Sequence, residues 1–198
     1  MLNETTYQLD VNGAAETLKG VSVVTPLHRN KTWSDKTGCE VYLKREDLQT
    51  VRSYKIRGAY NKMSSLTREE LQIGVVCASA GNHAQGVAYS CALLKTNGTI
   101  FMPVTTPKQK LEQVEMFGGQ YIQVELSGDT FDDAAQAAKA FCSENNMTFI
   151  HPFDDLKVIE GQATVGREIM QQTMDFPDYV FVPIGGGGLA SGVAHVIK

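Results

Sequence analysis

Short hydrophobic runs alternate with amphipathic helical patterns along most of the chain. Five runs have the length and composition of β-strands. They are GVVCAS (74–79), TIFMPV (99–104), QYIQVEL (120–126), TFIHPF (148–153) and YVFVPI (179–184). Helical patterns of ten or more residues separate them. This alternation predicts βαβ units, and therefore an α/β fold with an open, mostly parallel sheet covered by helices on both faces.

Local signals place the ends of several helices. Thr67 and Glu70 form a capping-box pattern just before the first run, and Asp129-Thr130 are cap candidates for a later helix. Another helix begins at Pro107 and stops at Gly118-Gly119. Nearer the start, CEVYLKRED (39–47) is typical of a strand that runs into a polar loop. The apolar stripe of the next helix consists of Ile56, Ala59, Tyr60 and Met63.

Composition narrows the class of protein. Of the 198 residues, 42% are hydrophobic and 20% are charged, as in a globular domain, and the net charge is −4 without a basic block, which argues against nucleic acid as a partner. No apolar run approaches the roughly 20 residues of a membrane helix. Residues 1–20 lack the charged-then-apolar design of a signal peptide.

The four cysteines are far apart and form no CxxC pair, which favours free thiols and a cytoplasmic setting. Cys77 and Cys91 lie in apolar surroundings, where a cysteine usually serves as a small buried hydrophobe.

Two turns that follow predicted strands have unusual sequences. Ligands of open parallel sheets bind where the strands end, so the turns SAGNHAQG (79–86) and GGGGLASG (185–192) are candidate sites. Four consecutive glycines are costly to order, but they let several backbone N–H groups converge on an anion at the start of a helix. A tight structural turn is the alternative.

The identity of such an anion is open at this level. The nucleotide-binding pattern GxxxxGK[ST] is absent, whereas Gly185, Gly187 and Ala190 satisfy the loose dinucleotide fingerprint GxGxxA. A nicotinamide-dinucleotide domain is therefore one hypothesis, although any run of glycines matches this fingerprint easily.

Three segments in the predicted βα register resemble one enzyme family. SYKIRGAY (53–60), SAGNHAQG and GGGGLASG are similar to the fold type II (tryptophan-synthase-β-like) pyridoxal-phosphate enzymes, and most similar to the threonine dehydratases, or threonine ammonia-lyases. The likeness covers the chain from about residue 20. It extends to TPLHRN (25–30), LKREDLQ (43–49), TTPKQKLEQVEMFGG (105–119) and HPFDD (151–155).

This resemblance implies roles for particular residues. Lys55 matches the lysine that holds pyridoxal 5'-phosphate covalently and then moves the Cα proton of the substrate. The other residues that match cofactor-binding positions are Tyr54, Asn82, Gly185, Gly186, Gly187, Gly188 and Leu189. The loop that matches the binding site of the substrate carboxylate comprises Ser79, Ala80, Gly81, Asn82 and His83.

Alternative readings exist for two of these side chains. Lys55 taken alone is equally consistent with a solvated lysine near Arg45, Arg52 and Arg57, although neighbouring cations would favour its neutral, nucleophilic form. His83 invites a role as general base, which we decline because the lysine already serves as one. The other histidines, His28, His151 and His195, show no spacing typical of a metal site.

The residue at position 80, here alanine, distinguishes two kinds of enzyme within this family. The related serine racemases have a serine there, which acts as a second acid/base, and alanine cannot move a proton. The resemblance therefore implies elimination: L-threonine yields 2-oxobutanoate and ammonia, with L-serine as a poorer substrate. Residues 105–119 look more like the biosynthetic branch, which leads to isoleucine, than the catabolic one.

The resemblance also implies a domain division and a longer relative. Residues 53–154 match a complete small α/β domain, while 1–52 and 155–198 match parts of a large, phosphate-binding domain. Family members continue beyond residue 198, so we expect an N-terminal fragment, self-associating as a homo-oligomer. The remaining hypotheses are an active threonine dehydratase, a weakly cofactor-binding but inactive fragment, and a related serine dehydratase or racemase.

Overall fold

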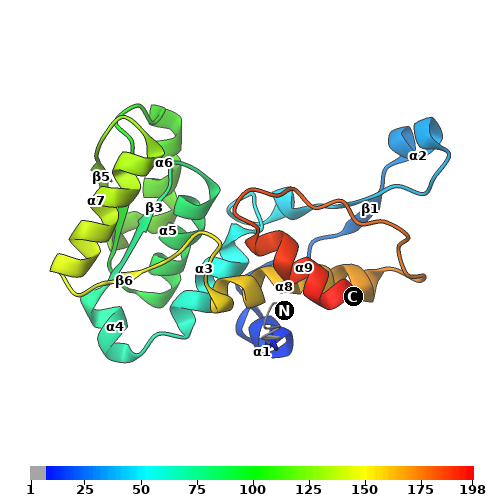
Figure 1. Ribbon diagram of the computed structural model, residues 1–198, viewed down its shortest axis with the longest axis horizontal. Coiled ribbons are helices and arrows are strands. Elements are labelled where there is room, and N and C mark those ends of the chain that lie inside the picture. Colours follow the sequence, from blue (N-terminus) through cyan, green and yellow to red (C-terminus); the bar gives the residue numbers. More distant parts are fainter. Residues whose placement is uncertain (1–7) are drawn as a thin grey trace, which may run out of the picture.

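The computed structural model describes residues 8–198 (Figure 1). The α-helices are α1 (Val11–Thr17), α2 (Lys31–Thr37), α3 (Lys55–Ser64), α4 (Arg68–Ile73), α5 (Asn82–Leu94), α6 (Lys108–Gly118), α7 (Phe131–Glu144), α8 (Leu156–Gln172) and α9 (Gly188–Ile197), with 3₁₀ turns η1 (Glu46–Leu48) and η2 (Gly119–Tyr121). The strands are β1 (Leu27–Arg29), β2 (Tyr42–Lys44), β3 (Val75–Ala78), β4 (Gly98–Met102), β5 (Ile122–Leu126) and β6 (Thr148–Phe149).

The predicted parallel sheet is confirmed. Four strands pair in the order β5-β4-β3-β6, and every pair is parallel. Alternate side chains of a strand point to opposite faces, so Val75 and Cys77 pack with α3, α5 and α6, while Val76 and Ala78 pack with α7. Helices therefore cover both faces of this sheet (Figure 1).

A second group of elements lies beside the sheet. The long helix α8 contacts α1, α3 and α9, and a small apolar cluster around Val165, Ile169 and Val193 joins α8 to α9. Strands β1 and β2 form a separate antiparallel pair. Figure 1 shows this group on the right of the view, with the parallel sheet on the left.

Several local predictions are confirmed. Thr67 and Glu70 form a capping box at the start of α4, and Pro107 precedes the first residue of α6. Thr130 caps α7, where Asp133 completes a second capping box. On α3, Ile56 and two other stripe residues, Ala59 and Met63, are fully buried, whereas Tyr60 is only partly buried.

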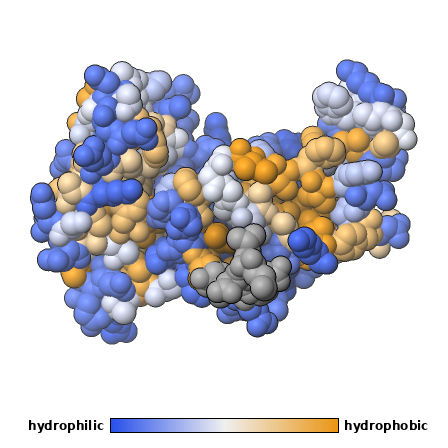
Figure 2. All heavy atoms as spheres, in the orientation of Figure 1, coloured by the Kyte–Doolittle hydropathy of each residue, from blue (hydrophilic) through white to orange (hydrophobic). Residues whose placement is uncertain are grey.

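The predicted strand at 179–184 is wrong. This segment forms no strand, because no segment among residues 8–198 pairs with its backbone. It keeps a two-residue alternation: Val180 and Val182 pack toward α8 and α9, whereas Tyr179 and Phe181 are 82% and 93% exposed. Hydrophobic residues gather in this part of the surface in Figure 2. The predicted strand at 148–153 is also shorter, since only Thr148–Phe149 pairs.

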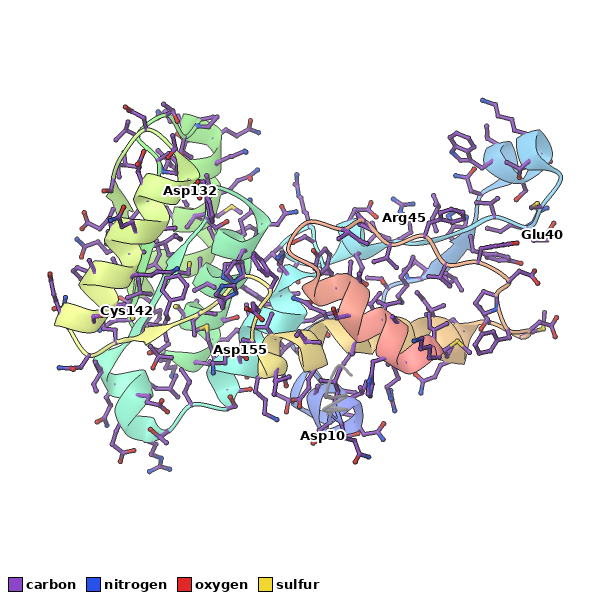
Figure 3. The ribbon with its side chains drawn as sticks, in the orientation of Figure 1. Asp10, Glu40, Arg45, Asp132, Cys142 and Asp155 are labelled. Carbon is purple, nitrogen blue, oxygen red and sulfur yellow. The ribbon has the colours of Figure 1, made fainter. Side chains whose placement is uncertain are left out.

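The cysteines behave largely as expected. All four are free, and Cys77, Cys91 and Cys142 are buried, while Cys39 is exposed. Cys142 lies on α7, as labelled in Figure 3. The absence of a signal peptide was expected for residues 1–20, of which 1–7 lie outside the described part. Among residues 8–198, no helix is long and apolar enough to cross a membrane.

Candidate active site

Lys55 is the first residue of α3, and its amine faces the loop between β6 and α8. Its Nζ donates a hydrogen bond to the carbonyl oxygen of Pro152 at 2.6 Å and lies 5.5 Å from the centre of the Tyr54 ring. Burial lowers the pKa of Lys55 from its usual value. A larger share of the amine is therefore neutral, and hence nucleophilic, than in a solvated lysine.

The cause of this lowered pKa differs from the one expected from sequence. Arg57 does not act on Lys55 as a free cation, because Glu46 and Glu168 both form ion pairs with its guanidinium inside the protein. Arg45 pairs with Asp47 near the surface. The prediction had the right direction, but burial rather than cation repulsion produces it.

The glycine run precedes and begins α9. Gly187 has φ +90°, in the region that favours glycine, and it occupies the N-cap position. An added Cβ on Gly186 would lie 2.2 Å from the Phe153 ring, and one on Gly188 would lie 2.7 Å from the Phe153 carbonyl oxygen. These glycines therefore permit both a left-handed turn and close packing against Phe153 at the start of α9.

One cavity joins the lysine to this glycine run. It encloses about 250 Å³. Its walls are Tyr54, Lys55, Pro152, Phe153, Gln162, Pro183, Gly185, Gly186, Gly187, Gly188 and Leu189. Residues predicted from two segments about 130 positions apart in the sequence thus line a single space.

The SAGNHAQG loop lies next to this cavity but does not line it. Asn82 is exposed at the first position of α5, and the Gly81 N–H donates to the Ser79 hydroxyl at 3.2 Å. One turn further along α5, a Cβ on Gly86 would lie 3.1 Å from the Lys55 carbonyl group. The starts of α3 and α5 are therefore in close contact, which brings Ser79, Ala80, Gly81, Asn82 and His83 near the lysine without placing them in the wall.

His83 is a buried, neutral side chain. Its Nε2 lies 2.9 Å from the Ile150 carbonyl oxygen, and burial lowers its pKa to about 3. A neutral ring donates through Nε2 here, since a carbonyl oxygen can only accept. This bond attaches the start of α5 to the chain just before Pro152.

His151 shapes the loop that carries Pro152 and Phe153. Its Nδ1 accepts hydrogen bonds from the N–H groups of Phe153 and Asp154, and its ring packs edge-on against Phe153 at 4.7 Å. Asp155, labelled in Figure 3, then caps α8. No group of three or more possible metal ligands occurs among residues 8–198.

Sequence reasoning missed four wall residues. Pro152 and Phe153 belong to HPFDD, a segment that showed the resemblance without indicating a role. Pro183 is the penultimate residue of the run 179–184, whose pattern predicts a strand. Gln162 lies in a helix whose pattern shows only an apolar stripe, so nothing in the sequence separates it from the other glutamines of the chain.

Comparison with known families agrees with this geometry. The model of the family described as "Pyridoxal-phosphate dependent enzyme" matches residues 20–198. The chain belongs to this pyridoxal-phosphate dependent enzyme family.

Curated relatives within this family carry one name. The biosynthetic L-threonine dehydratase IlvA of Halalkalibacterium halodurans is 58% identical over 189 residues, which cover 96% of this chain and 46% of that protein. The protein of the same name from Bacillus subtilis is 53% identical, over 93% of this chain and 44% of that protein. The chain thus spans about half the length of these relatives.

Solved structures of family members have the same fold. The processed form of threonine deaminase isoform 2 from Solanum lycopersicum aligns with a TM-score of 0.89 at 46% identity, over 95% of this chain and 51% of that one. Maize serine racemase aligns with a TM-score of 0.90 at 32% identity, over 97% of this chain and 58% of that one. The fold type II prediction is confirmed.

Proposed function

We propose that this chain is the N-terminal half of a biosynthetic threonine dehydratase, which converts L-threonine into 2-oxobutanoate and ammonia. The observation that carries the proposal is the single cavity that connects the Lys55 amine with the glycine run at the start of α9. An amine and a glycine run that line one cavity match the two functional groups of pyridoxal 5'-phosphate, its aldehyde and its phosphate.

The residues present suit this cofactor. Lys55 supplies a buried amine with a lowered pKa for the aldehyde carbon. The N–H groups of Gly185 to Gly188 and of Leu189 bind the phosphate, helped by the positive end of the α9 dipole. Tyr54, in the cavity wall, would contact the pyridine ring, and Asn82, exposed at the start of α5 next to the cavity, would hydrogen-bond to the ring hydroxyl group. When bound, the cofactor withdraws electrons from the substrate Cα and so weakens its Cα–H bond.

Lys55 also moves the proton in this proposal. Its amine would hold the cofactor and, when not bonded to it, would accept the Cα proton of the substrate. Loss of that proton and of the Cβ hydroxyl group amounts to loss of water. The water returns when the nitrogen leaves as ammonia, so that threonine becomes 2-oxobutanoate plus ammonia with no other reactant.

The SAGNHAQG loop binds the substrate carboxylate in this scheme. The start of α5 offers backbone N–H groups beside Lys55, a favourable location for an anion. Ala80 provides no acid or base on the opposite face of the substrate. We therefore propose elimination rather than racemisation, although a serine racemase is among the structures with this fold.

The wider setting is part of the proposal. Residues 53–154 form the small domain, 1–52 and 155–198 belong to the large one, and the full-length protein works in the cytoplasm as a homo-oligomer on the route to isoleucine. The names of the relatives support this assignment. A second candidate function, cofactor binding without turnover, is favoured by the coverage of only 46% of the first relative.

Two measurements test the proposal. Addition of pyridoxal 5'-phosphate followed by borohydride should fix the cofactor on the Lys55 peptide, as seen by mass spectrometry. Release of 2-oxobutanoate from L-threonine then separates an active enzyme from a binding-only fragment. Cofactor fixed on another lysine, or no cofactor fixed at all, would overturn the proposed function.

A further inference from the structure

Gln162 carries a buried acceptor without a partner. Its side chain lies on α8 in the cavity wall and is 1% exposed, and its Oε1 accepts no hydrogen bond in the part of the chain that the structure describes. A buried amide oxygen that loses water without gaining a donor costs about 1–3 kcal/mol. A buried acceptor without a partner in a cavity wall calls for an explanation, and a donor that approaches it within the cavity would supply one.

The position of this amide is tightly constrained. A Cβ added to Gly58, on α3, would lie 2.3 Å from the Gln162 Nε2 atom. Gly58 lies three residues after Lys55, so the two residues lie on the same face of α3. The backbone of the lysine-bearing helix therefore holds the amide at the cavity.

Lys55 has donors to spare. Its amine uses one N–H for the Pro152 carbonyl oxygen, whereas an ammonium group has three N–H groups and a neutral amine has two. Apart from the Tyr54 hydroxyl, Gln162 has the only side-chain acceptor among the residues that line the cavity. An amine that attacks a carbon atom in the cavity must turn away from the Pro152 carbonyl oxygen, and the Gln162 amide oxygen is an acceptor within the same cavity wall.

We infer that Gln162 is a positioning residue for Lys55, whose amine donates a hydrogen bond to the Gln162 amide oxygen once it leaves Pro152. This inference rests on the proposed role of Lys55. An amide suits the task better than a carboxylate, because it accepts a hydrogen bond without adding a negative charge that would keep the amine protonated.

The charges around Lys55 are consistent with an amide, rather than a carboxylate, as its partner. The titratable side chains that face it are Tyr54 on its own helix, His83 from α5 and His151 from the loop, and none is a carboxylate. On α8 the two buried carboxylates have other partners. Glu160 pairs with Lys157, and Glu168 pairs with Arg57 and Lys44.

The first test compares Gln162→Glu with Gln171→Glu, an exposed position on the same helix. The rate at which acetic anhydride acetylates Lys55 is followed by mass spectrometry across a pH range, with no cofactor present. Gln162→Glu should reduce the reactive fraction at a given pH about tenfold, equivalent to one pKa unit, while Gln171→Glu should not. A pH profile of Gln162→Glu that matches the wild type would overturn the inference.

The second test uses Gln162→Met, which keeps the volume but removes the acceptor. Its melting temperature should equal or exceed that of the wild type, since no hydrogen bond is lost. Its rate of borohydride-fixed cofactor capture should fall about fivefold, the value of one net hydrogen bond. Capture at the wild-type rate would contradict the inference. Acetylation of Lys55 needs no cofactor. The inference about Gln162 can therefore fail or succeed in the first test independently of the proposed function.

Discussion

The Lys55 amine and the Pro152 carbonyl oxygen are joined by a hydrogen bond of 2.6 Å that links the start of α3 to the loop between β6 and α8. The loop is itself held by His151 and, through Ile150, by His83. The amine is thus positioned by residues almost 100 places further along the chain, and the shape of this loop determines where its chemistry can occur.

Replacing Lys55 by alanine should abolish both covalent capture of the cofactor and formation of keto acid, because no other lysine among residues 8–198 lines the cavity. Lys110→Ala, at an exposed position on α6, serves as the control. Borohydride reduction followed by peptide mapping checks the result. The assignment is wrong if Lys55→Ala still captures cofactor at native occupancy.

L-serine should yield pyruvate without D-serine. Ala80 offers no group that could donate a proton to the opposite face of the substrate, so the deprotonated substrate either regains its proton from Lys55 as L-serine or eliminates. Chiral chromatography of the products is the measurement, and Ala80→Ser is the informative partner variant. Accumulation of D-serine by the wild-type protein would contradict the argument.

Gly187→Ala should separate backbone strain from cofactor binding when it is compared with Gly20→Ala. Both glycines have positive φ with no atom near the added methyl, so each change should cost about 1–2 kcal/mol of unfolding free energy. Only Gly187→Ala should weaken binding of pyridoxal 5'-phosphate. Circular dichroism and cofactor titration measure the two effects.

Gly186→Val tests the same loop by direct contact. The added side chain would occupy the space of the Phe153 ring, so the loop must shift and its affinity for the phosphate should fall while the folded structure persists. A folded Gly186→Val protein with unchanged cofactor affinity would exclude the cradle.

Arg57→Met should destabilise the protein by about 3–5 kcal/mol, because it leaves the carboxylates of Glu46 and Glu168 buried with one cation fewer. Arg45→Met, which breaks a more exposed pair with Asp47, should cost much less, because solvent screens that pair. Urea unfolding at neutral pH compares them. Equal losses would show that the buried cluster contributes no more than a surface pair.

His83 should make stability depend on pH in the acid range. Its pKa is about 3 in the folded state and 6.5 when exposed, so between these values the unfolded chain binds a proton that the folded protein does not. The free energy of unfolding therefore falls as pH drops below 6.5, by at most about 1.4 kcal/mol per unit from this group. The slope should be smaller in His83→Gln, as measured by urea titrations at several pH values.

Sequence alone predicted the parallel sheet because strands buried on both faces leave continuous apolar runs, as in Val75–Ala78. It also predicted the capping box of Thr67 and Glu70, which depends on residues three apart, and Thr130 as a cap, but not the second box that Asp133 completes. It could not place Gln162 or Pro152 at the site, because their roles arise from contacts between distant segments. The prediction of a strand at 179–184 was wrong for a related reason. A strand requires a neighbouring strand as well as a suitable sequence.

The exposed side chains of that run affect how the chain can be studied. Tyr179, Phe181 and Ile184 offer an apolar strip on the folded protein. A dye that fluoresces on apolar surfaces should therefore bind before any unfolding begins, and its signal would start high and change little on heating. Melting of this chain is better followed by circular dichroism, and the same dye, added to native protein, reports whether another polypeptide has covered the strip.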